Sequence, residues 1–287
     1  MNYGALGLSK LTAMNRTQTP LRVGTVPFLV ARPLDCGLGD EDGITLQPDV
    51  PARLVERLRS GELDVALVSS IELFRQPGYR YLDGLAVAGH GFVASVQVFL
   101  RKPLEEVQTV AMDPASRAAA TLVRTMLAER KGGPPEYLEC SLEEDARAVK
   151  ADAWLRIGDQ ALREYLEPNA REVFNPSQAW RERTGLPFVF ATWIVRPGVD
   201  MTPHLDAFDR ARARGEKKRV EYAEQASQQW NLPLDACRSY LLDECVYEPG
   251  APMQEALAEF QRRAAAINLC DASLAPEPIE NRASHVS

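Results

Sequence analysis

Histidine is scarce in this sequence, and the spacings that bind metal ions are missing. The chain has 287 residues but only 3 histidines, His90, His204 and His285, which lie far apart. We find no His-Glu-x-x-His motif and no paired cysteine or histidine spacing of the kind that holds zinc. A metal site and a histidine-based catalytic triad are therefore not expected, and His90 is interpreted as structural or exposed.

Cysteine is also infrequent, and long apolar runs are absent. The 5 cysteines are widely spaced and form no Cys-x-x-Cys pair: Cys36, Cys140, Cys237, Cys245 and Cys270. This usage is typical of reduced thiols, so we predict a cytoplasmic protein. Residues 1–20 lack the continuous apolar core of a signal peptide, and no stretch approaches the roughly 20 apolar residues of a membrane span. We therefore expect a flexible segment over 1–20 and no membrane-spanning helix.

Motifs for nucleotide binding and for serine hydrolysis are missing as well. The sequence has no Walker loop, no Gly-x-Gly-x-x-Gly after a strand and no Gly-x-Ser-x-Gly elbow. Phosphoryl and hydride transfer are thus disfavoured, and we expect no cofactor. The net charge of -7 argues against a nucleic-acid partner. The one basic cluster, 210–219, lies in a helical pattern and is interpreted as a solvated helix face, with polyanion binding as the alternative.

What the sequence does contain is the pattern of an α/β protein. Hydrophobic residues make up 45% and charged residues 25%, which are ordinary globular values, and the length favours two lobes over one. Strand and helix signals alternate before a helical final third. We predict strands at 22–29, 44–47, 63–68, 81–87, 91–100, 109–113, 137–140, 153–157 and 188–195. We predict helices at 49–61, 116–129, 142–149, from 159, 203–228, 233–242 and 252–267.

The stretch 180–195, WRERTGLPFVFATWIV, marks the change from alternating to helical character. Its turn, Thr184 to Pro187, leads from a charged helical end into the almost wholly apolar run 188–195. Such a short run, rich in β-branched and aromatic residues and introduced by Gly and Pro, is typical of a strand buried on both faces of a parallel sheet. We predict that this strand carries the chain from one lobe back to the other.

Polar residues stand where several predicted elements meet. Ser69 and Ser70 follow a strand, at the edge where open α/β sheets bind ligands, although either also suits a helix cap. Ser116 is placed as an N-cap, and Arg117 in the first turn opposes the helix dipole, which indicates either a bound anion or a salt bridge within the protein. Asp159 follows another strand and either caps a helix or faces a ligand. These residues favour a cleft for a small anion.

Several separated blocks of the sequence share a resemblance that extends over about 21–270. The blocks are RVGTVPFLVARPL (22–34), LRSGELDVALVSSIE (58–72), GFVASVQVF (91–99), MDPASR (112–117), ADAWLRIGDQAL (151–162), AWRERTGLPFVFATWIV (179–195) and SYLLDECVYEPG (239–250). Together they resemble the chorismate dehydratases, which act in menaquinone biosynthesis by the futalosine pathway.

The resemblance implies an α/β fold of the type II periplasmic-binding-protein kind, with a ligand cleft between two lobes. One lobe would comprise 21–102 and 189–273, including the C-terminal helices, and the other 103–188, while 274–287 would form a flexible tail. It also implies a lyase that removes water from chorismate to give 3-[(1-carboxyvinyl)oxy]benzoate. Loss of the ring C3 proton with the C4 hydroxyl makes the ring aromatic, so neither a metal nor a redox cofactor is required.

The resemblance further implies a set of site residues. Ser95 is the implied catalytic residue, because it would hold the enolpyruvyl carboxylate of the substrate so that this carboxylate acts as the base. The implied substrate-binding residues are Val30, Ser69, Ser70, Val93, Ser116, Arg117 and Asp159.

Three positions depart from the family pattern. The family usually has Asn where Val30 stands, and commonly Thr-Ser in place of Ala118-Ala119. Each change removes a group that forms hydrogen bonds. Two alternatives therefore stand beside the dehydratase: a paralogue that binds a small anion without catalysis or with altered specificity, and a related naphthoate-forming lyase of the same pathway.

Overall fold

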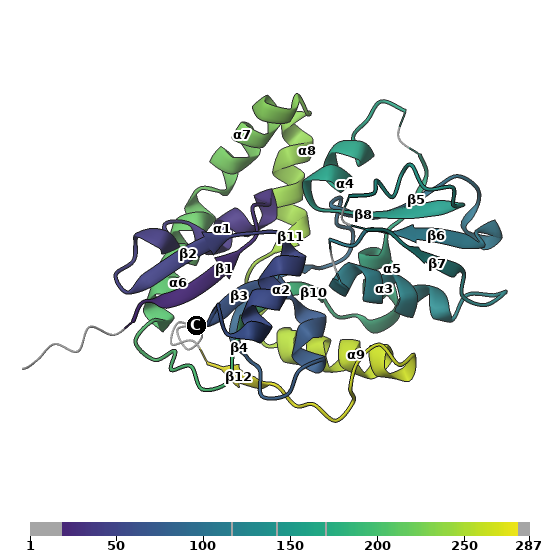
Figure 1. Cartoon of the computed structure of the whole chain (residues 1–287). Helices are drawn as coiled ribbons and strands as arrows, with labels where there is room; N and C mark the ends of the chain where they lie inside the picture. The colour runs from purple at the N-terminus through teal and green to yellow at the C-terminus, as the bar shows by residue number, and fades with distance from the viewer. Residues whose placement is uncertain (1–18, 116, 142, 170, 281–287) are drawn as a thin grey trace, which may run out of the picture.

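The chain folds into two β-sheets that lie side by side, each covered by helices, as the computed structural model shows (Figure 1). Described are residues 19–115, 117–141, 143–169 and 171–280. Most of the segment expected to be flexible, 1–18, lies outside the described residues, and so does Ser116. The two-lobed α/β architecture predicted from the sequence is confirmed.

The first sheet joins strands from both ends of the chain. Its 7 strands are β1 (Leu21–Thr25), β2 (Ile44–Pro48), β3 (Val65–Ser69), β4 (Arg80–Gly89), β10 (Phe188–Val195), β11 (Cys245–Val246) and β12 (Glu277–Ile279). They are ordered β11-β4-β10-β3-β1-β2, and β12 pairs with β4. β1 runs parallel to β2 and β3. Every residue of β3 is buried, which explains its unbroken apolar run.

The second sheet is formed by one continuous part of the chain. Its 5 strands are β5 (Val96–Leu100), β6 (Thr109–Met112), β7 (Glu136–Glu139), β8 (Ala153–Ile157) and β9 (Val173–Phe174), in the order β7-β6-β8-β5-β9. A lobe boundary at residue 102 would place β5 in the first lobe, whereas β5 pairs with β8 and β9. We therefore propose to divide the lobes within 90–95, between β4 and β5.

The central strand β10 occupies the residues predicted for it, 188–195, and is almost completely buried. The prediction of a strand is confirmed, but the prediction that it lies in a parallel sheet is wrong. β10 runs antiparallel to both of its neighbours, β3 and β4. The reason is topological: the chain returns from the second sheet and enters the first from the end at which β4 leaves. Burial of both faces gave β10 the apolar composition of a parallel strand.

The helices mostly follow the sequence prediction. They are α1 (Arg32–Asp35), α2 (Pro51–Ser60), α3 (Arg117–Ala128), α4 (Gly158–Tyr165), α5 (Pro176–Thr184), α6 (Leu205–Lys217), α7 (Arg219–Trp230), α8 (Leu234–Ser239) and α9 (Pro252–Ala266). The single helix predicted over 203–228 is two helices. The backbone leaves the helical conformation at Lys218, whose φ is -102° and ψ 1°.

Two further predictions differ from the structure. In place of the helix expected over 142–149, the described residues 143–149 form turns. The Asp145 carboxylate accepts a hydrogen bond from the Arg147 N–H at 2.8 Å, and such local side-chain bonds compete with a helix. The tail expected to be flexible from residue 274 contains β12, which pairs in parallel with β4.

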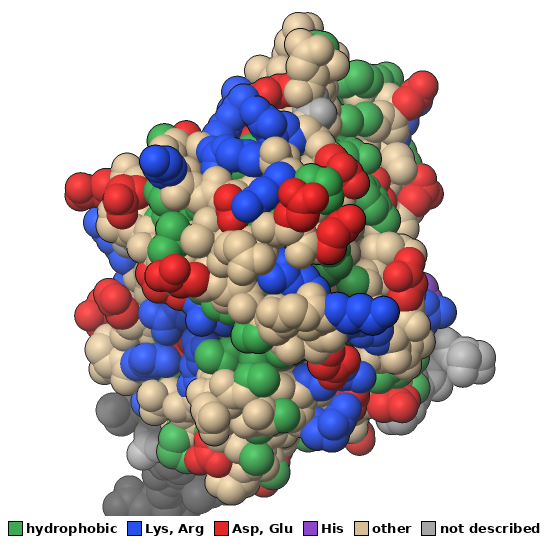
Figure 2. Space-filling view, turned by 90° about the vertical axis from the view of Figure 1, so that its right-hand side faces the viewer, with side chains coloured by type: hydrophobic (Ala, Val, Ile, Leu, Met, Phe, Trp, Pro, Cys, Tyr) green, Lys and Arg blue, Asp and Glu red, His purple; other side chains and the backbone are tan. Residues whose placement is uncertain are grey.

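The surface on the side of the second sheet carries charges of both signs. Figure 2 shows Lys and Arg side chains interspersed with Asp and Glu, with apolar side chains between them. The basic cluster at 210–219 is also paired, since Arg210 and Arg214 both contact Glu41, at 2.5 and 2.8 Å. These contacts favour the interpretation of the cluster as an ordinary helix surface.

Candidate functional site

A partly open hollow, here called the inner pocket, lies where the two sheets meet. It is lined by the loop after β1, the carboxyl end of β3, the middle of β10, the segment before β5 and the start of α4. The space between its atoms is about 680 Å³, including the part open to solvent. Among the described residues that line it, none carries a charged side chain. The pocket is therefore apolar with a few neutral polar groups.

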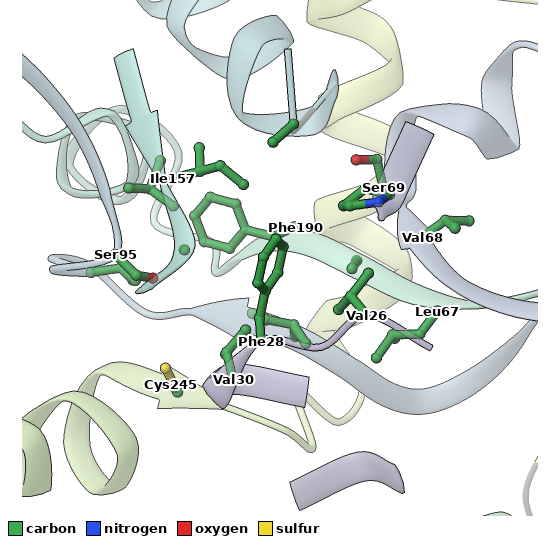
Figure 3. Close-up of a pocket in the computed structure, with 18 residues that line it drawn as sticks. Val26, Phe28, Val30, Leu67, Val68, Ser69, Ser95, Ile157, Phe190 and Cys245 are labelled. Atoms are coloured by element: carbon green, nitrogen blue, oxygen red, sulfur yellow. The ribbon is translucent and has the colours of Figure 1, made fainter. Parts of the chain in front are cut away.

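Two aromatic rings occupy the middle of the inner pocket. Phe28 comes from the loop between β1 and the 3-10 turn Leu29–Ala31, and Phe190 from β10. Figure 3 shows both rings at its centre, with Ser95 and Cys245 to one side and Ser69 to the other. A flat ring would find apolar surface here, and a polar group at either end of it would face a hydroxyl.

The two pocket hydroxyls are held by regular structure. Ser69 is the last residue of β3 and is 8% exposed, and Ser95 immediately precedes β5 and is 5% exposed. The Ser95 carbonyl accepts a hydrogen bond from the Gly158 N–H at 2.8 Å, which fixes it beside the start of α4. A low-dielectric wall strengthens any hydrogen bond these hydroxyls donate to an anion.

Four of the site residues expected from the sequence line the inner pocket: Val30, Ser69, Val93 and Ser95. Ser70 is adjacent to Ser69 but has a different position. Its hydroxyl is fully buried and donates to the carbonyl of Val189 at 2.6 Å, so it ties β10 to the end of β3. The pair of serines thus divides into one pocket residue and one structural residue.

Arg117 lies at the start of α3 but does not contact the inner pocket. Its guanidinium donates to Glu72 at 3.1 Å, and Glu72 also receives Arg59 at 2.5 Å and Arg75 at 3.4 Å. Glu72 is fully buried and follows β3 in the first lobe, whereas α3 follows β6 in the second. The salt bridge left open as an alternative is therefore present. Ser116, the predicted N-cap, lies outside the described residues.

Asp159 faces an outer cleft that adjoins the inner pocket. The two hollows share Phe28, Pro51, Ala115 and Ile157. The Asp159 carboxylate accepts hydrogen bonds from the Leu29 N–H at 3.2 and 3.4 Å, which connects the two lobes. Burial raises the pKa of this carboxyl to about 6, although the Leu29 N–H opposes the rise. Asp159 is therefore a bridge at the mouth of the pocket.

The outer cleft is rich in carboxylates. Asp113 is buried there, and burial raises its pKa despite a hydrogen bond from the Ala115 N–H at 2.8 Å. Arg156 is 8% exposed and donates to Glu164 at 3.1 Å. Among the described residues, no group of three or more His, Cys, Asp or Glu is placed to hold a metal ion.

Some pocket residues were not predicted from the sequence. Phe190 was interpreted only as part of a buried strand, and nothing in the alternation of that strand distinguishes it from its neighbours. Cys245 was treated as one of several free thiols, although it lies in the block 239–250 that carried the family resemblance. The available signal for Phe190 and Cys245 was their position in blocks 179–195 and 239–250, which resemble the family.

Comparisons with known proteins show the family to which the chain belongs. A family model described as menaquinone biosynthesis matches residues 21–266. The chain is 34% identical over 172 residues to the chorismate dehydratase of Thermus thermophilus, a match covering 54% of this chain and 62% of that enzyme, which is less than two thirds of its length. It is 28% identical over 224 residues to the chorismate dehydratase of Campylobacter jejuni, covering 77% of this chain and 83% of that enzyme.

Solved structures show the same fold at low sequence identity. An Archaeoglobus fulgidus protein has a TM-score of 0.72 at 17% identity, covering 88% of this chain and 99% of that one. The alkanesulfonate-binding protein of Xanthomonas axonopodis has a TM-score of 0.63 at 17% identity, covering 88% and 94%. A Candida albicans protein with the generic periplasmic-binding-protein fold has a TM-score of 0.56 at 11% identity, covering 91% and 97%. The expected binding-protein-like fold is confirmed.

Proposed function

We propose that this chain, which belongs to the menaquinone biosynthesis family, is a lyase that dehydrates chorismate to 3-[(1-carboxyvinyl)oxy]benzoate in the futalosine pathway. The single observation that carries the proposal is the match of that family to residues 21–266, which encloses the whole inner pocket. Both relatives named above are chorismate dehydratases.

The proposed reaction needs positioning more than it needs strong acids or bases. The C4–O bond of chorismate breaks, the C3 proton is removed, and water leaves as the ring gains its third double bond. Aromatisation supplies the driving force. An apolar pocket with few hydroxyls suits this chemistry, because it holds a flat ring and orients the groups at its edge.

The pocket residues take the following roles in this proposal. Phe28 and Phe190 contact the faces of the ring. Ser69 and Ser95, on opposite sides of those rings, hydrogen-bond the two carboxylates. Ser95 positions the enolpyruvyl carboxylate of the substrate, and this carboxylate removes the C3 proton. Neutral donors in a dry site bind an anion without a formal countercharge when their hydrogen bonds are well aimed.

The proposal places the reaction in the cytoplasm. The five cysteines are free thiols, which is the usual state in a reducing compartment. Among the described residues, no helix is both long and apolar enough to cross a membrane.

A second candidate is a paralogue that binds a small anion without turnover or with altered specificity. The observation that favours it is Val30, a branched apolar side chain that lines the inner pocket where the family usually has Asn. Loss of a hydrogen bond to a charged partner costs about 1.5–3 kcal/mol, which is roughly ten- to a hundredfold in binding.

Incubation with chorismate distinguishes the two candidates. We expect the purified protein to form the aromatic enol ether, detected by ultraviolet absorbance and mass spectrometry. Ser95→Ala should lower kcat/KM by roughly ten- to a hundredfold, since it removes a donor to a charged group. Ser70→Ala, whose hydroxyl is bonded to Val189, serves as the control and should change kcat/KM little. Tight binding of chorismate with no product would overturn the dehydratase in favour of the paralogue.

A further inference from the structure

A buried tyrosine that no proposed step uses lies behind the wall of the inner pocket. Tyr240 is 0% exposed, and its hydroxyl has no hydrogen-bond partner of good geometry among the described residues. The Ser95 hydroxyl, the Cys245 thiol, the Tyr247 hydroxyl and the Asp159 carboxylate all lie near enough to affect the pKa of the Tyr240 hydroxyl. Of these four residues, Ser95 and Cys245 line the inner pocket. A buried hydroxyl without a partner destabilises the folded chain, so its position beside two pocket residues requires a reason.

The backbone that presents Tyr240 is unusual. Tyr240–Glu244 form one turn of π-helix that continues α8, and such turns are rare and frequent at functional sites. The next residue, Cys245, begins β11 and pairs with Gly89 at the end of β4. The Glu244 carboxylate accepts a hydrogen bond from the Ala94 N–H at 2.7 Å. The end of the π-helix therefore contacts both ends of the segment that joins the lobes, Gly89 before it and Ala94 next to Ser95.

Three of the groups near Tyr240 are neutral hydrogen-bond donors, the Ser95 and Tyr247 hydroxyls and the Cys245 thiol, and the fourth is the Asp159 carboxylate. Burial raises the pKa of the Cys245 thiol to about 12 and raises the pKa of the Tyr240 hydroxyl well above its usual value. Both groups keep their protons near neutral pH. If the Tyr240 O–H donates to the Ser95 oxygen, the Ser95 O–H cannot donate back to Tyr240. Because Ser95 lines the inner pocket, its O–H is then free to donate to a group inside the pocket. An acceptor on a ligand would then complete the chain of hydrogen bonds.

We propose that Tyr240 is a positioning residue that orients the Ser95 hydroxyl toward an oxygen of a carboxylate-bearing ring ligand. The Tyr240 hydroxyl donates to Ser95, and Ser95 donates to the ligand carboxylate. The hydrogen bond between the two side chains tightens when the ligand enters, as is common for sites whose geometry is loose without ligand. This assignment rests on the proposed function only in taking Ser95 as a contact of the carboxylate.

Tyr247 provides a matched control. It is also buried, at 3% exposed, and its hydroxyl is likewise without a partner of good geometry among the described residues. Its ring lies under the Arg219 guanidinium at 5.3 Å, and it does not line the inner pocket. Like the Tyr240 hydroxyl, the Tyr247 hydroxyl lies near the Cys245 thiol, but Ser95 is not among the groups that shift its pKa. Tyr247→Phe therefore removes an equivalent buried hydroxyl beside Cys245 and leaves the surroundings of Ser95 unchanged.

The test is a double-mutant cycle read by calorimetry. The probes are 3-hydroxybenzoate and its uncharged amide, 3-hydroxybenzamide, titrated into the intact chain, Tyr240→Phe, Ser95→Ala and the double variant. We expect Tyr240→Phe to weaken 3-hydroxybenzoate binding about tenfold and amide binding much less. The double variant should bind the acid about as weakly as Ser95→Ala alone, because Tyr240 acts through Ser95. Tyr247→Phe should bind both probes as the unmodified chain does.

Several results would overturn the inference. They are additive losses in the double variant, equal losses for acid and amide, equal effects of the two tyrosine changes, and no binding of the acid by the unmodified chain. Chorismate turnover separates this inference from the proposed function. Probe binding that depends on Tyr240 together with no turnover leaves the positioning role and removes the dehydratase. Normal turnover and binding in Tyr240→Phe remove the positioning role and leave the dehydratase.

Discussion

Val30 is the residue at which the chemistry of the inner pocket differs most plainly from the family pattern. It is half-buried, follows Phe28 in the loop after β1, and lines the pocket with its branched side chain. An apolar side chain at this place excludes water but donates nothing to an anion. The ligand must therefore take its hydrogen bonds from other walls of the pocket, where Ser69 and Ser95 stand.

Replacing this valine with asparagine tests its role. We expect Val30→Asn to raise kcat/KM for chorismate, or its affinity if turnover is absent, by roughly tenfold, because the amide adds a donor to a charged partner. The free protein should lose about 1 kcal/mol of unfolding free energy, since the amide is left partly unsatisfied in an apolar wall. Val30→Ala, which adds no donor, is the control. A fall in affinity with Asn would indicate a ligand whose apolar part faces Val30.

At the level of elements, α1 and α6 pack more closely than side chains allow. A Cβ added at Gly215, in α6, would lie 2.0 Å from the Pro33 carbonyl oxygen and 2.5 Å from its Cα, which are backbone atoms of α1. The close approach of the two helices therefore requires glycine at position 215, although alanine has the higher helix propensity. It also fixes α1, which directly follows the turn that carries Val30.

Gly215→Ala should therefore destabilise the protein. Alanine favours the helix by about 1 kcal/mol, but the clash with a backbone that cannot yield outweighs this, and we expect a net loss of about 2 kcal/mol. Chemical denaturation monitored by circular dichroism measures it. Gly39→Ala is the control, because its Cβ would lie at an ordinary 3.4 Å from the Leu46 side chain. Equal stabilities for the two variants would show that α1 moves freely.

At the level of the whole molecule, three contacts join the lobes to each other or to the segment between them. Asp159 accepts from the Leu29 N–H, Glu72 receives Arg117, and Glu244 accepts from the Ala94 N–H. All three carboxylates are at least partly buried. Burial raises the pKa of both Asp159 and Glu244, so the contacts that these two carboxylates make should depend on pH.

The Asp159 bridge predicts a pH dependence. Its pKa rises from the model-peptide value of 3.8 to about 6 in the folded chain, so its contribution to stability is fully present below about pH 4 and is lost as the pH rises through 6. The loss amounts to roughly 3 kcal/mol. Asp159→Asn, which keeps an acceptor for Leu29 but does not ionise, should remove this fall. Unfolding free energies measured from pH 4 to 7 provide the comparison.

Asp200→Asn is the control for that series, because the pKa of Asp200 is lowered whereas that of Asp159 is raised. Asp200 accepts a hydrogen bond from the Thr202 N–H at 2.9 Å, which lowers its pKa. Its contribution is present above about pH 4 and is lost only on further acidification, so Asp200→Asn should leave the slope between pH 4 and 7 unchanged. If Asp159→Asn leaves the pH profile of the unmodified chain unchanged, the carboxyl is not desolvated in the folded protein.

The sequence by itself determined the α/β class, the positions of most strands and helices, and four of the residues that line the pocket. These follow from periodicity, from turn residues and from blocks that resemble a family, which are all local properties. The strand at 188–195 illustrates the limit. Its apolar run predicted a buried strand but could not give its direction, because burial on both faces produces the same composition in parallel and antiparallel sheets.

Only the tertiary structure decided which neighbours meet. Ser69 and Ser70 are adjacent in sequence, yet one lines the pocket and the other bonds to Val189, because successive residues point in different directions. Arg117 meets Glu72 across the lobes, and Glu244, at the end of a π-helix turn, accepts a hydrogen bond from the Ala94 N–H. Such contacts join residues far apart in the chain, and their geometry is set by the packing of whole elements, which no local pattern encodes.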